Sequence, residues 1–213
     1  MKLTVFGASG GTGTQLVRQA LDAGHEVTAV ARESSRLSFP DHPGLTVIRA
    51  DVRSPNAVGP AVEGRDAVLS ALGSTSARTP TDVCAAGVRG ILGAMADTGA
   101  RRLIVVSASG AFTDGGDGPF TRLVAKPLLQ RFLRHPFADT RIMEEEIRAT
   151  ADLDWTIVRP PRLTDGPRTG RYRTSLDRNV RGGLTLSRAD LADCVLNRLD
   201  DPETIRTVVC VGY

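Results

Sequence analysis

Residues 7–13, GASGGTG, combine closely spaced glycines with hydroxyl side chains, a pattern suited to binding phosphate. The short apolar segment Leu3–Phe6 precedes this run, and Thr14–Ala23, with apolar residues at helical spacing, follows it. Glycine permits a tight turn, a close approach of the backbone to a diphosphate, and close packing of helix on strand. The helix would direct unpaired N–H groups and its positive end at the phosphates. The alternative is an ordinary tight turn. The predicted contacts are Gly7, Ser9, Gly10, Gly11, Thr12 and Gly13.

A basic, hydroxyl-rich stretch follows the next predicted strand, Val27–Ala31. Folds that bind NAD place an acidic residue near this point, where it binds the ribose 2′-hydroxyl. This chain instead has Arg32, with Ser35 and Arg36 close behind, while Glu33 should point to the opposite side of an extended chain. Guanidinium groups can bind a dianionic 2′-phosphate in a bidentate manner. The stretch therefore favours NADP(H) as cofactor, and the alternative is that Arg32 is a solvated surface residue.

The ends of the following two strands would continue the cofactor site, because parallel strands of such sheets end at one edge. Asp51 could accept a hydrogen bond from the adenine amine, and Val52 could cover the ring face. A helix cap is an equally good explanation for Asp51. Leu72 and Gly73 end the next strand, where glycine would let the backbone lie against the second ribose.

Residues near the last two predicted strands would lie at the nicotinamide end. Ser107 and Pro160 are assigned to the cofactor site. Ser109 is the candidate catalytic residue, since a hydroxyl there could position a carbonyl group or hold the carboxamide; a strand-end turn is the alternative. Phe112 and Arg162 are assigned to substrate binding.

The elements that must position these residues alternate between strands and helices, which indicates a parallel sheet covered on both faces. The expected fold class is therefore α/β, a doubly wound, mostly parallel sheet of the Rossmann type with small C-terminal pocket insertions. One domain spans residues 1–213, with a dinucleotide-binding core over 1–110 and pocket elements over 111–135 and 160–186. Helices are predicted from Ser54-Pro55 and over Thr81–Thr98, and the remaining strands are predicted at Leu45–Ile48, Ala67–Ala71, Leu103–Val106 and Thr156–Val158.

Composition excludes several classes of protein. The 213 residues are 41% hydrophobic and 24% charged, as in ordinary globular domains. The net charge of +3 is too small to argue for nucleic acid, and no apolar run approaches the roughly 20 residues of a membrane helix, so neither partner is expected. Lysine occurs only at Lys2 and Lys126. The three cysteines, Cys84, Cys194 and Cys210, are far apart in the sequence. This spacing predicts buried thiols, no metal site and a cytoplasmic location.

Two further features are expected to be structural. The glutamates at 144–146 share a predicted helix with Arg141 and Arg148, which predicts a solvated charged face. Trp155 opens the last predicted strand and is expected in the core.

Together with the glycine run, Arg32 and Asp51-Val52, the stretch 154–161, DWTIVRPP, gives the chain a family resemblance. It resembles the atypical short-chain dehydrogenase/reductases of the NAD(P)H-binding, NmrA-like type, and within them most resembles the biliverdin-IXβ reductase/flavin reductase group. The likeness extends over nearly all 213 residues. It implies a monomer or weak dimer with an NADPH site and a shallow pocket for flat, conjugated acceptors.

The chain departs from the resemblance in ways that bear on its reaction. It has no Tyr-x-x-x-Lys pair, which argues against a tyrosine acid. Ser109 keeps one hydroxyl of that group's Thr-Ser pair, while Gly110 replaces the other. Arg141 and Glu145 stand in the region of that group's histidines. The expected function is NADPH-dependent hydride transfer to a flavin, quinone or tetrapyrrole; the alternatives are a non-catalytic NADP(H) sensor and, less favoured, an isomerase.

Overall fold

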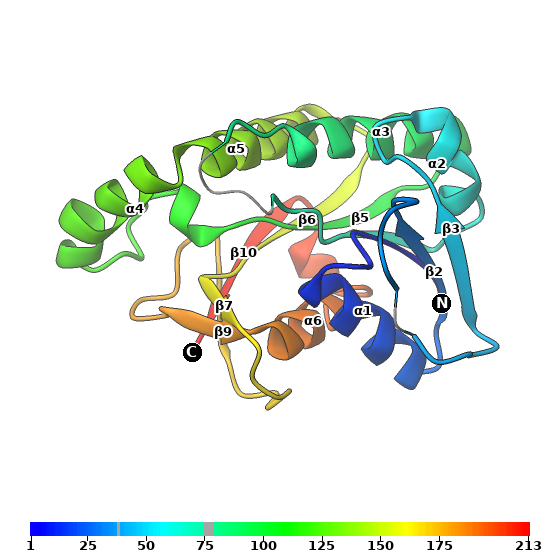
Figure 1. Cartoon of the computed structure of the whole chain (residues 1–213). Helices are drawn as coiled ribbons and strands as arrows, with labels where there is room; N and C mark the ends of the chain where they lie inside the picture. Colours follow the sequence, from blue (N-terminus) through cyan, green and yellow to red (C-terminus); the bar gives the residue numbers. More distant parts are fainter. Residues whose placement is uncertain (38, 75–78) are drawn as a thin grey trace.

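The computed structural model describes residues 1–37, 39–74 and 79–213. A central sheet of mostly parallel strands runs through the middle of the molecule (Figure 1). The strands are β1 (Lys2–Phe6), β2 (Glu26–Ala31), β3 (Leu45–Arg49), β4 (Ala67–Ser70), β5 (Arg102–Val106), β6 (Asp154–Arg159), β7 (Arg162–Thr164), β8 (Arg173–Leu176), β9 (Thr185–Ser187) and β10 (Thr207–Gly212). Eight of them form one sheet in the order β3-β2-β1-β4-β5-β6-β10-β8. Among the strands of the described residues, β8 alone pairs antiparallel, and β7 and β9 form a separate parallel pair.

Helices cover both faces of this sheet, as short crossovers between parallel strands require. They are α1 (Gly11–Asp22), α2 (Pro55–Val62), α3 (Val83–Thr98), α4 (Lys126–Phe132), α5 (Arg134–Ala149) and α6 (Arg188–Leu196), with shorter turns η1 (Ser109–Ala111), η2 (Thr121–Ala125) and η3 (Pro202–Thr204). In Figure 1, α2, α3 and α5 lie above the sheet, and α1 and α6 lie below it. The expected doubly wound α/β fold is confirmed.

Two hydrophobic clusters hold these layers together, one on each face of the sheet. The first joins α2, α3 and α5 to the sheet around Ile91, Met95 and Ile147, and Trp155 belongs to it, as expected. The second joins α1 to α6 around Leu16 and Leu191. All three cysteines are free and buried, which confirms the expected buried thiols, and burial raises the pKa of each thiol to about 12.

The strands and helices expected in the first 160 residues are confirmed within a few residues at each end. Gly24 follows α1 with φ +79°, the left-handed conformation expected of a glycine after a helix. The region after Pro161 contains more regular structure than the sequence indicated, namely β7 to β10 and α6. No helix among the described residues is long and apolar enough to span a bilayer.

Candidate dinucleotide-binding site

The glycine run forms a compact turn between β1 and α1. Gly7 has φ +74°, and a Cβ added there would lie 2.7 Å from the carbonyl oxygen of Ala71. A Cβ on Gly13 would overlap the carbonyl oxygen of Gly7. The Gly10 N–H donates to that same oxygen at 2.9 Å. Gly7 and Gly13 must therefore be glycine, because a side chain at either position would overlap the backbone. The turn brings the start of α1 against the ends of β1 and β4.

The N-terminus of α1 has the properties of an anion site. Gly10 is the N-cap residue, so no side chain caps the helix, and the first turn contains no acidic residue. The first-turn N–H groups of such a helix have no intrahelical partner and carry a partial positive charge. Ser9 and Gly10 line an adjacent pocket of about 470 Å³. A diphosphate is the kind of group that these donors can bind.

That pocket lies where the strand order reverses between β1 and β4, the usual position of a nucleotide in this architecture. Its lining comes from the ends of these two strands, from the end of β2 and from the segments that follow β3 and β4. The predicted cofactor residues that line it are Gly7, Ser9, Gly10, Arg32, Val52, Leu72 and Gly73. Gly11, Thr12 and Gly13 belong to the start of α1 and do not line the pocket.

The basic turn after β2 is held in place from the neighbouring strand. Arg49, at the end of β3, donates from Nη1 to the carbonyl oxygens of Arg32 at 2.9 Å and Ser35 at 2.5 Å. The Arg32 side chain is exposed and lines the pocket. Arg36 is exposed as well but does not line the pocket. Arg53 does line it and is paired with Asp82, a contact that the sequence pattern did not indicate.

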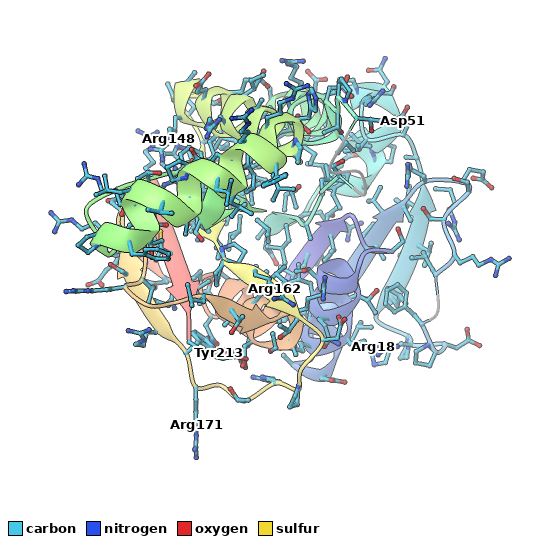
Figure 2. The ribbon with its side chains drawn as sticks, turned by 60° about the vertical axis from the view of Figure 1, so that its left-hand side comes forward. Arg18, Asp51, Arg148, Arg162, Arg171 and Tyr213 are labelled. Carbon is cyan, nitrogen blue, oxygen red and sulfur yellow. The ribbon has the colours of Figure 1, made fainter. Side chains whose placement is uncertain are left out.

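Asp51 belongs to the turn that leads into α2. Its Oδ1 accepts a hydrogen bond from the backbone N–H of Arg53 at 3.0 Å, and Ser54 is the N-cap of the helix. The carboxylate thus stabilises a turn, so the helix-cap alternative is wrong, and Asp51 is not among the pocket-lining residues. Figure 2 shows Asp51 at the upper edge of the molecule, beside α2. An adenine contact from Asp51 remains a prediction.

The residues predicted for the nicotinamide end lie at the ends of β5 and β6. The Ser109 N–H donates to the Pro160 carbonyl oxygen at 2.9 Å, which brings the two segments together. Ser109 is half-buried, and its hydroxyl has no hydrogen-bond partner among the described residues. The hydroxyl of Ser107 instead donates to Glu144 Oε1 at 2.5 Å. Ser109 is therefore the hydroxyl of the two that remains available to a ligand.

Glu144 corrects the expectation of a solvated charged face on α5. The residue is 1% exposed, and its carboxylate accepts from Arg159 Nε at 2.9 Å and from Arg159 Nη2 at 2.5 Å. Arg148 lies one turn further along α5 at 3.4 Å. Of the three glutamates only Glu145 is exposed, while Glu146 pairs with Arg89. The buried pair ties α5 to the end of β6, directly before Pro160.

The two residues predicted to bind substrate have different surroundings. The Phe112 ring packs on the Arg159 guanidinium, with 3.5 Å between Cζ and the ring centroid, so one face of the ring is already used. Arg162 is exposed on β7, and Figure 2 places it near the middle of the molecule. The role of Phe112 and Arg162 in binding the substrate remains a prediction.

Arg188 is a functional candidate that the sequence did not reveal. It begins α6, far along the chain from the glycine run, yet a Cβ on Gly11 would lie 2.7 Å from its Cδ and 2.9 Å from its Nε. Its Nη1 donates to Asp165 Oδ1 at 2.6 Å. The only local signal was that Gly11 is an additional glycine, outside the three needed by the phosphate-binding turn.

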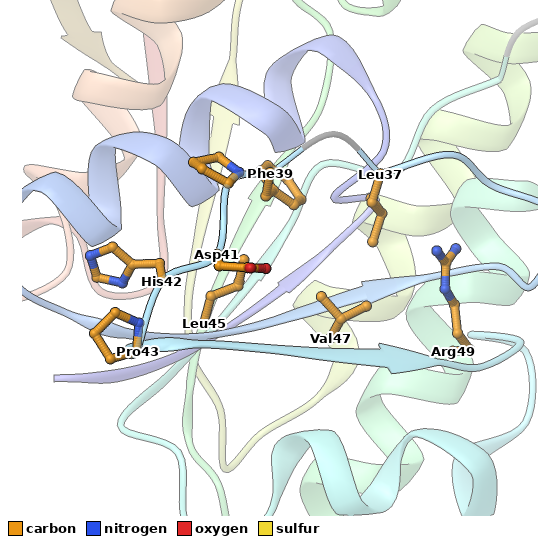
Figure 3. A pocket seen from close by; sticks show the side chains of 9 residues that line it. Leu37, Phe39, Asp41, His42, Pro43, Leu45, Val47 and Arg49 are labelled. Atoms are coloured by element: carbon orange, nitrogen blue, oxygen red, sulfur yellow. The ribbon is translucent and has the colours of Figure 1, made fainter.

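A second hollow lies away from this site, along the edge strand β3 (Figure 3). It measures about 610 Å³ and lies between β3 and the segment before it, with Leu37, Phe39, Leu45 and Val47 among its lining residues. It shares no lining residue with the pocket at the glycine run. The glycine turn and the helix end belong only to the smaller pocket, which is therefore the candidate site.

The fold and this site define a dinucleotide-binding protein of the Rossmann type. The family model described as NAD(P)H-binding matches residues 7–202, and the chain belongs to that family. This confirms the resemblance to atypical short-chain dehydrogenase/reductases at the level of the family.

Individual relatives span the same length. The uncharacterized protein YwnB of Bacillus subtilis is 30% identical over 209 residues, which cover 95% of this chain and 94% of that protein. A Streptococcus pneumoniae protein proposed to be an NADH-flavin reductase has a TM-score of 0.78 at 25% identity, with 100% and 99% of the chains covered. A short-chain dehydrogenase/reductase from Veillonella parvula, solved in complex with NADP, has a TM-score of 0.80 at 21% identity, with 100% and 94% covered, and shows the shared fold.

Proposed function

We propose that the chain is an NADPH-dependent reductase that transfers hydride to a conjugated acceptor of the flavin, quinone or tetrapyrrole type. One observation carries this proposal: a single pocket at the strand-order reversal joins the uncapped end of α1 to Arg32. The helix end suits a diphosphate, and the guanidinium suits a 2′-phosphate. Membership of the NAD(P)H-binding family and the likeness to a proposed flavin reductase support it.

The residues of the chain would bind and orient, while the bound cofactor would supply the hydride and solvent the accompanying proton. Arg32 would hold the adenosine end, and Arg188 would stand beside the diphosphate at Gly11. Ser109, with its unpartnered hydroxyl, would orient either the carboxamide or the acceptor. The Ser109–Pro160 hydrogen bond fixes the backbone that carries this hydroxyl. Such positioning converts a bimolecular reaction into one between held groups.

The state of the tyrosines supports a reaction without a tyrosine acid. The Tyr172 hydroxyl donates to Asp193 Oδ2 at 2.6 Å, and burial together with this bond raises the pKa of Tyr172. The Tyr213 hydroxyl donates to Asp190 Oδ2 at 2.6 Å. Both phenols are engaged around α6, so neither is arranged as a proton donor to a substrate. An acceptor that takes its proton from water fits these surroundings.

The test is an assay of NADPH oxidation with FMN, a quinone dye or a tetrapyrrole as acceptor. The loss of absorbance of the reduced nicotinamide measures the rate. Turnover with at least one acceptor is expected. A Gly10→Asp variant is the control, because a carboxylate at the helix end repels the diphosphate and should abolish both binding and turnover. Tight NADPH binding without turnover on any acceptor would overturn the reductase and leave the NADP(H) sensor.

A further inference from the structure

The segment of residues 120–134, which contains η2 and α4, presents an unusual outer surface. We call it the η2–α4 segment; Figure 1 shows it projecting from one end of the molecule. A surface helix normally buries its apolar stripe and exposes its polar face. Here large apolar side chains are exposed, and several of them are exposed by half or more. They are Phe120 (72%), Leu123 (74%), Val124 (51%), Leu128 (55%), Leu129 (42%) and Phe132 (70%).

The inner face of the η2–α4 segment is polar. Lys126 is buried there, and its Nζ donates to the Phe112 carbonyl oxygen at 2.6 Å and to Asp117 Oδ2 at 2.8 Å. One turn further on, Gln130 Nε2 donates to the Gly110 carbonyl oxygen at 3.0 Å. The segment is therefore held on its inner side by hydrogen bonds, an ion pair and the approach of Leu129 to Gly110, while most of its apolar side chains face outward. The segment thus has its polar side toward the protein and its apolar side toward solvent, the reverse of an ordinary surface helix. An exposed apolar face of this kind indicates a binding surface.

The charges around the apolar face identify what covers it. The sequence contains no Asp or Glu between Asp117 and Asp139, whereas Arg122, Arg131 and Arg134 are all exposed in this stretch. Within this segment, the exposed charged side chains that accompany the apolar face are therefore all cationic. A second copy of the chain docked on this face would bring a second set of exposed arginines to the same apolar surface, which is unfavourable. An anionic lipid surface offers apolar chains below and negative headgroups around them.

We propose that the η2–α4 segment docks the protein peripherally on an anionic lipid bilayer. The apolar side chains enter the boundary between headgroups and acyl chains, and Arg122, Arg131 and Arg134 lie among the headgroups. This attachment needs no spanning helix, so it is compatible with the absence of such a helix from the described residues. It revises the sequence-based expectation of no membrane partner. The proposal does not depend on the reductase activity.

The test is co-sedimentation of the full chain with vesicles of phosphatidylcholine alone or phosphatidylcholine mixed with phosphatidylglycerol. We expect binding to the mixed vesicles to exceed binding to the neutral ones by about tenfold or more, and to weaken as salt is raised. The double variant Phe120→Ser/Phe132→Ser should lose binding to both kinds of vesicle. The double variant Arg122→Gln/Arg131→Gln should lose the preference for phosphatidylglycerol and most of the salt dependence.

Matched controls are available elsewhere on the surface. Leu184 is 67% exposed on the segment before β9, and Arg171 is exposed away from the η2–α4 segment (Figure 2). Leu184→Ser and Arg171→Gln should bind vesicles as the wild type does. Far-ultraviolet circular dichroism and NADPH binding would check that every variant is folded. No binding to mixed vesicles, or equal loss in the controls, overturns the proposal, as does a dimer in solution that Phe120→Ser/Phe132→Ser converts to a monomer.

Discussion

The side chain of Arg188 occupies the space that a side chain at Gly11 would need, since a Cβ there would lie 2.7 Å from Arg188 Cδ. A guanidinium is thereby placed beside the positive end of α1, an arrangement that is unfavourable unless an anion lies nearby. Its present partner is the carboxylate of Asp165, whose side chain is 90% exposed and forms a weak, solvated ion pair. A bound diphosphate would therefore compete with Asp165 for Arg188.

Removing this charge should weaken the binding of cofactors that carry a diphosphate. For Arg188→Gln we expect the Kd of NADPH to rise about tenfold, the loss of roughly one charge-assisted hydrogen bond. The Kd of 2′-AMP, which has no 5′-phosphate, should not change. Isothermal titration calorimetry measures both constants.

Asp165→Asn provides the opposite change, because it frees Arg188 without touching the pocket. It should leave NADPH binding unchanged or make it tighter. If Arg188→Gln weakened NADPH and 2′-AMP equally, Arg188 would act on the pocket as a whole and the diphosphate contact would be refuted. If neither nucleotide bound the wild type, the proposed function itself would fail.

Arg32 should decide between the two nicotinamide cofactors. It is the basic residue after β2 that lines the pocket, so Arg32→Gln should raise the Kd of NADPH about tenfold and leave that of NADH nearly unchanged. Arg36→Gln should have a smaller effect because Arg36 does not line the pocket. Fluorescence titration with both cofactors gives the ratio of affinities. An unchanged ratio in Arg32→Gln would contradict the assignment of NADP(H).

The buried pair of Glu144 and Arg159 should be important for stability. Replacing Glu144 by Gln leaves the Arg159 guanidinium, whose side chain is 9% exposed, without its anionic partner. We expect a loss of about 3–5 kcal/mol in the free energy of unfolding. Urea denaturation followed by circular dichroism measures it.

The matched control removes both charges together. Glu144→Leu combined with Arg159→Met leaves no buried ion unpaired, so it should recover much of the stability lost in Glu144→Gln. A double variant less stable than the single one would show that packing of Arg159 on Phe112 outweighs the charge.

The parts of the fold that the sequence predicted depend on local signals. The glycine turn, the apolar strands and Gly24 after α1 are each encoded within a few residues of their own position. The placement of Arg32 at the pocket also follows from its position at the end of a strand. Helix α6 was missed because seven of its nine residues are buried, so it has no polar face to give a helical period.

The parts that could not be predicted depend on contacts between distant segments. Glu144 and Glu145 are neighbours in a run of identical residues, yet one is buried and the other exposed. Only the pairing of α5 with the end of β6 decides which glutamate meets Arg159. Arg188 likewise reaches Gly11 across the fold, and the direction of the apolar face of the η2–α4 segment depends on the bonds of Lys126 and Gln130. The periodicity of the sequence identifies an apolar stripe on a helix, but it does not show whether that stripe faces the protein or the solvent.

Asp190 should make the stability of the C-terminal region dependent on acid pH. It is fully buried, and its carboxylate accepts from the Thr169 N–H at 2.7 Å, the Thr169 hydroxyl at 2.7 Å, the Gly170 N–H at 2.8 Å and the Tyr213 hydroxyl at 2.6 Å. Burial by itself would raise the pKa of Asp190, but the hydrogen bonds from Tyr213, Thr169 and Gly170 outweigh it and lower the pKa.

Because the folded-state pKa of Asp190 lies below the unfolded value of about 3.9, its contribution to stability is fully present above that value. It is lost as the pH falls through the lower folded-state pKa, where the folded protein also binds the proton. We expect Asp190→Asn to lose about 2 kcal/mol in the free energy of unfolding at neutral pH, since the charged acceptor is gone. The gap between wild type and variant should then narrow as the pH falls below about 4. Urea denaturation of both proteins across this range measures the gap, and a constant difference down to the lowest pH would show that Asp190 contributes through shape and not through charge.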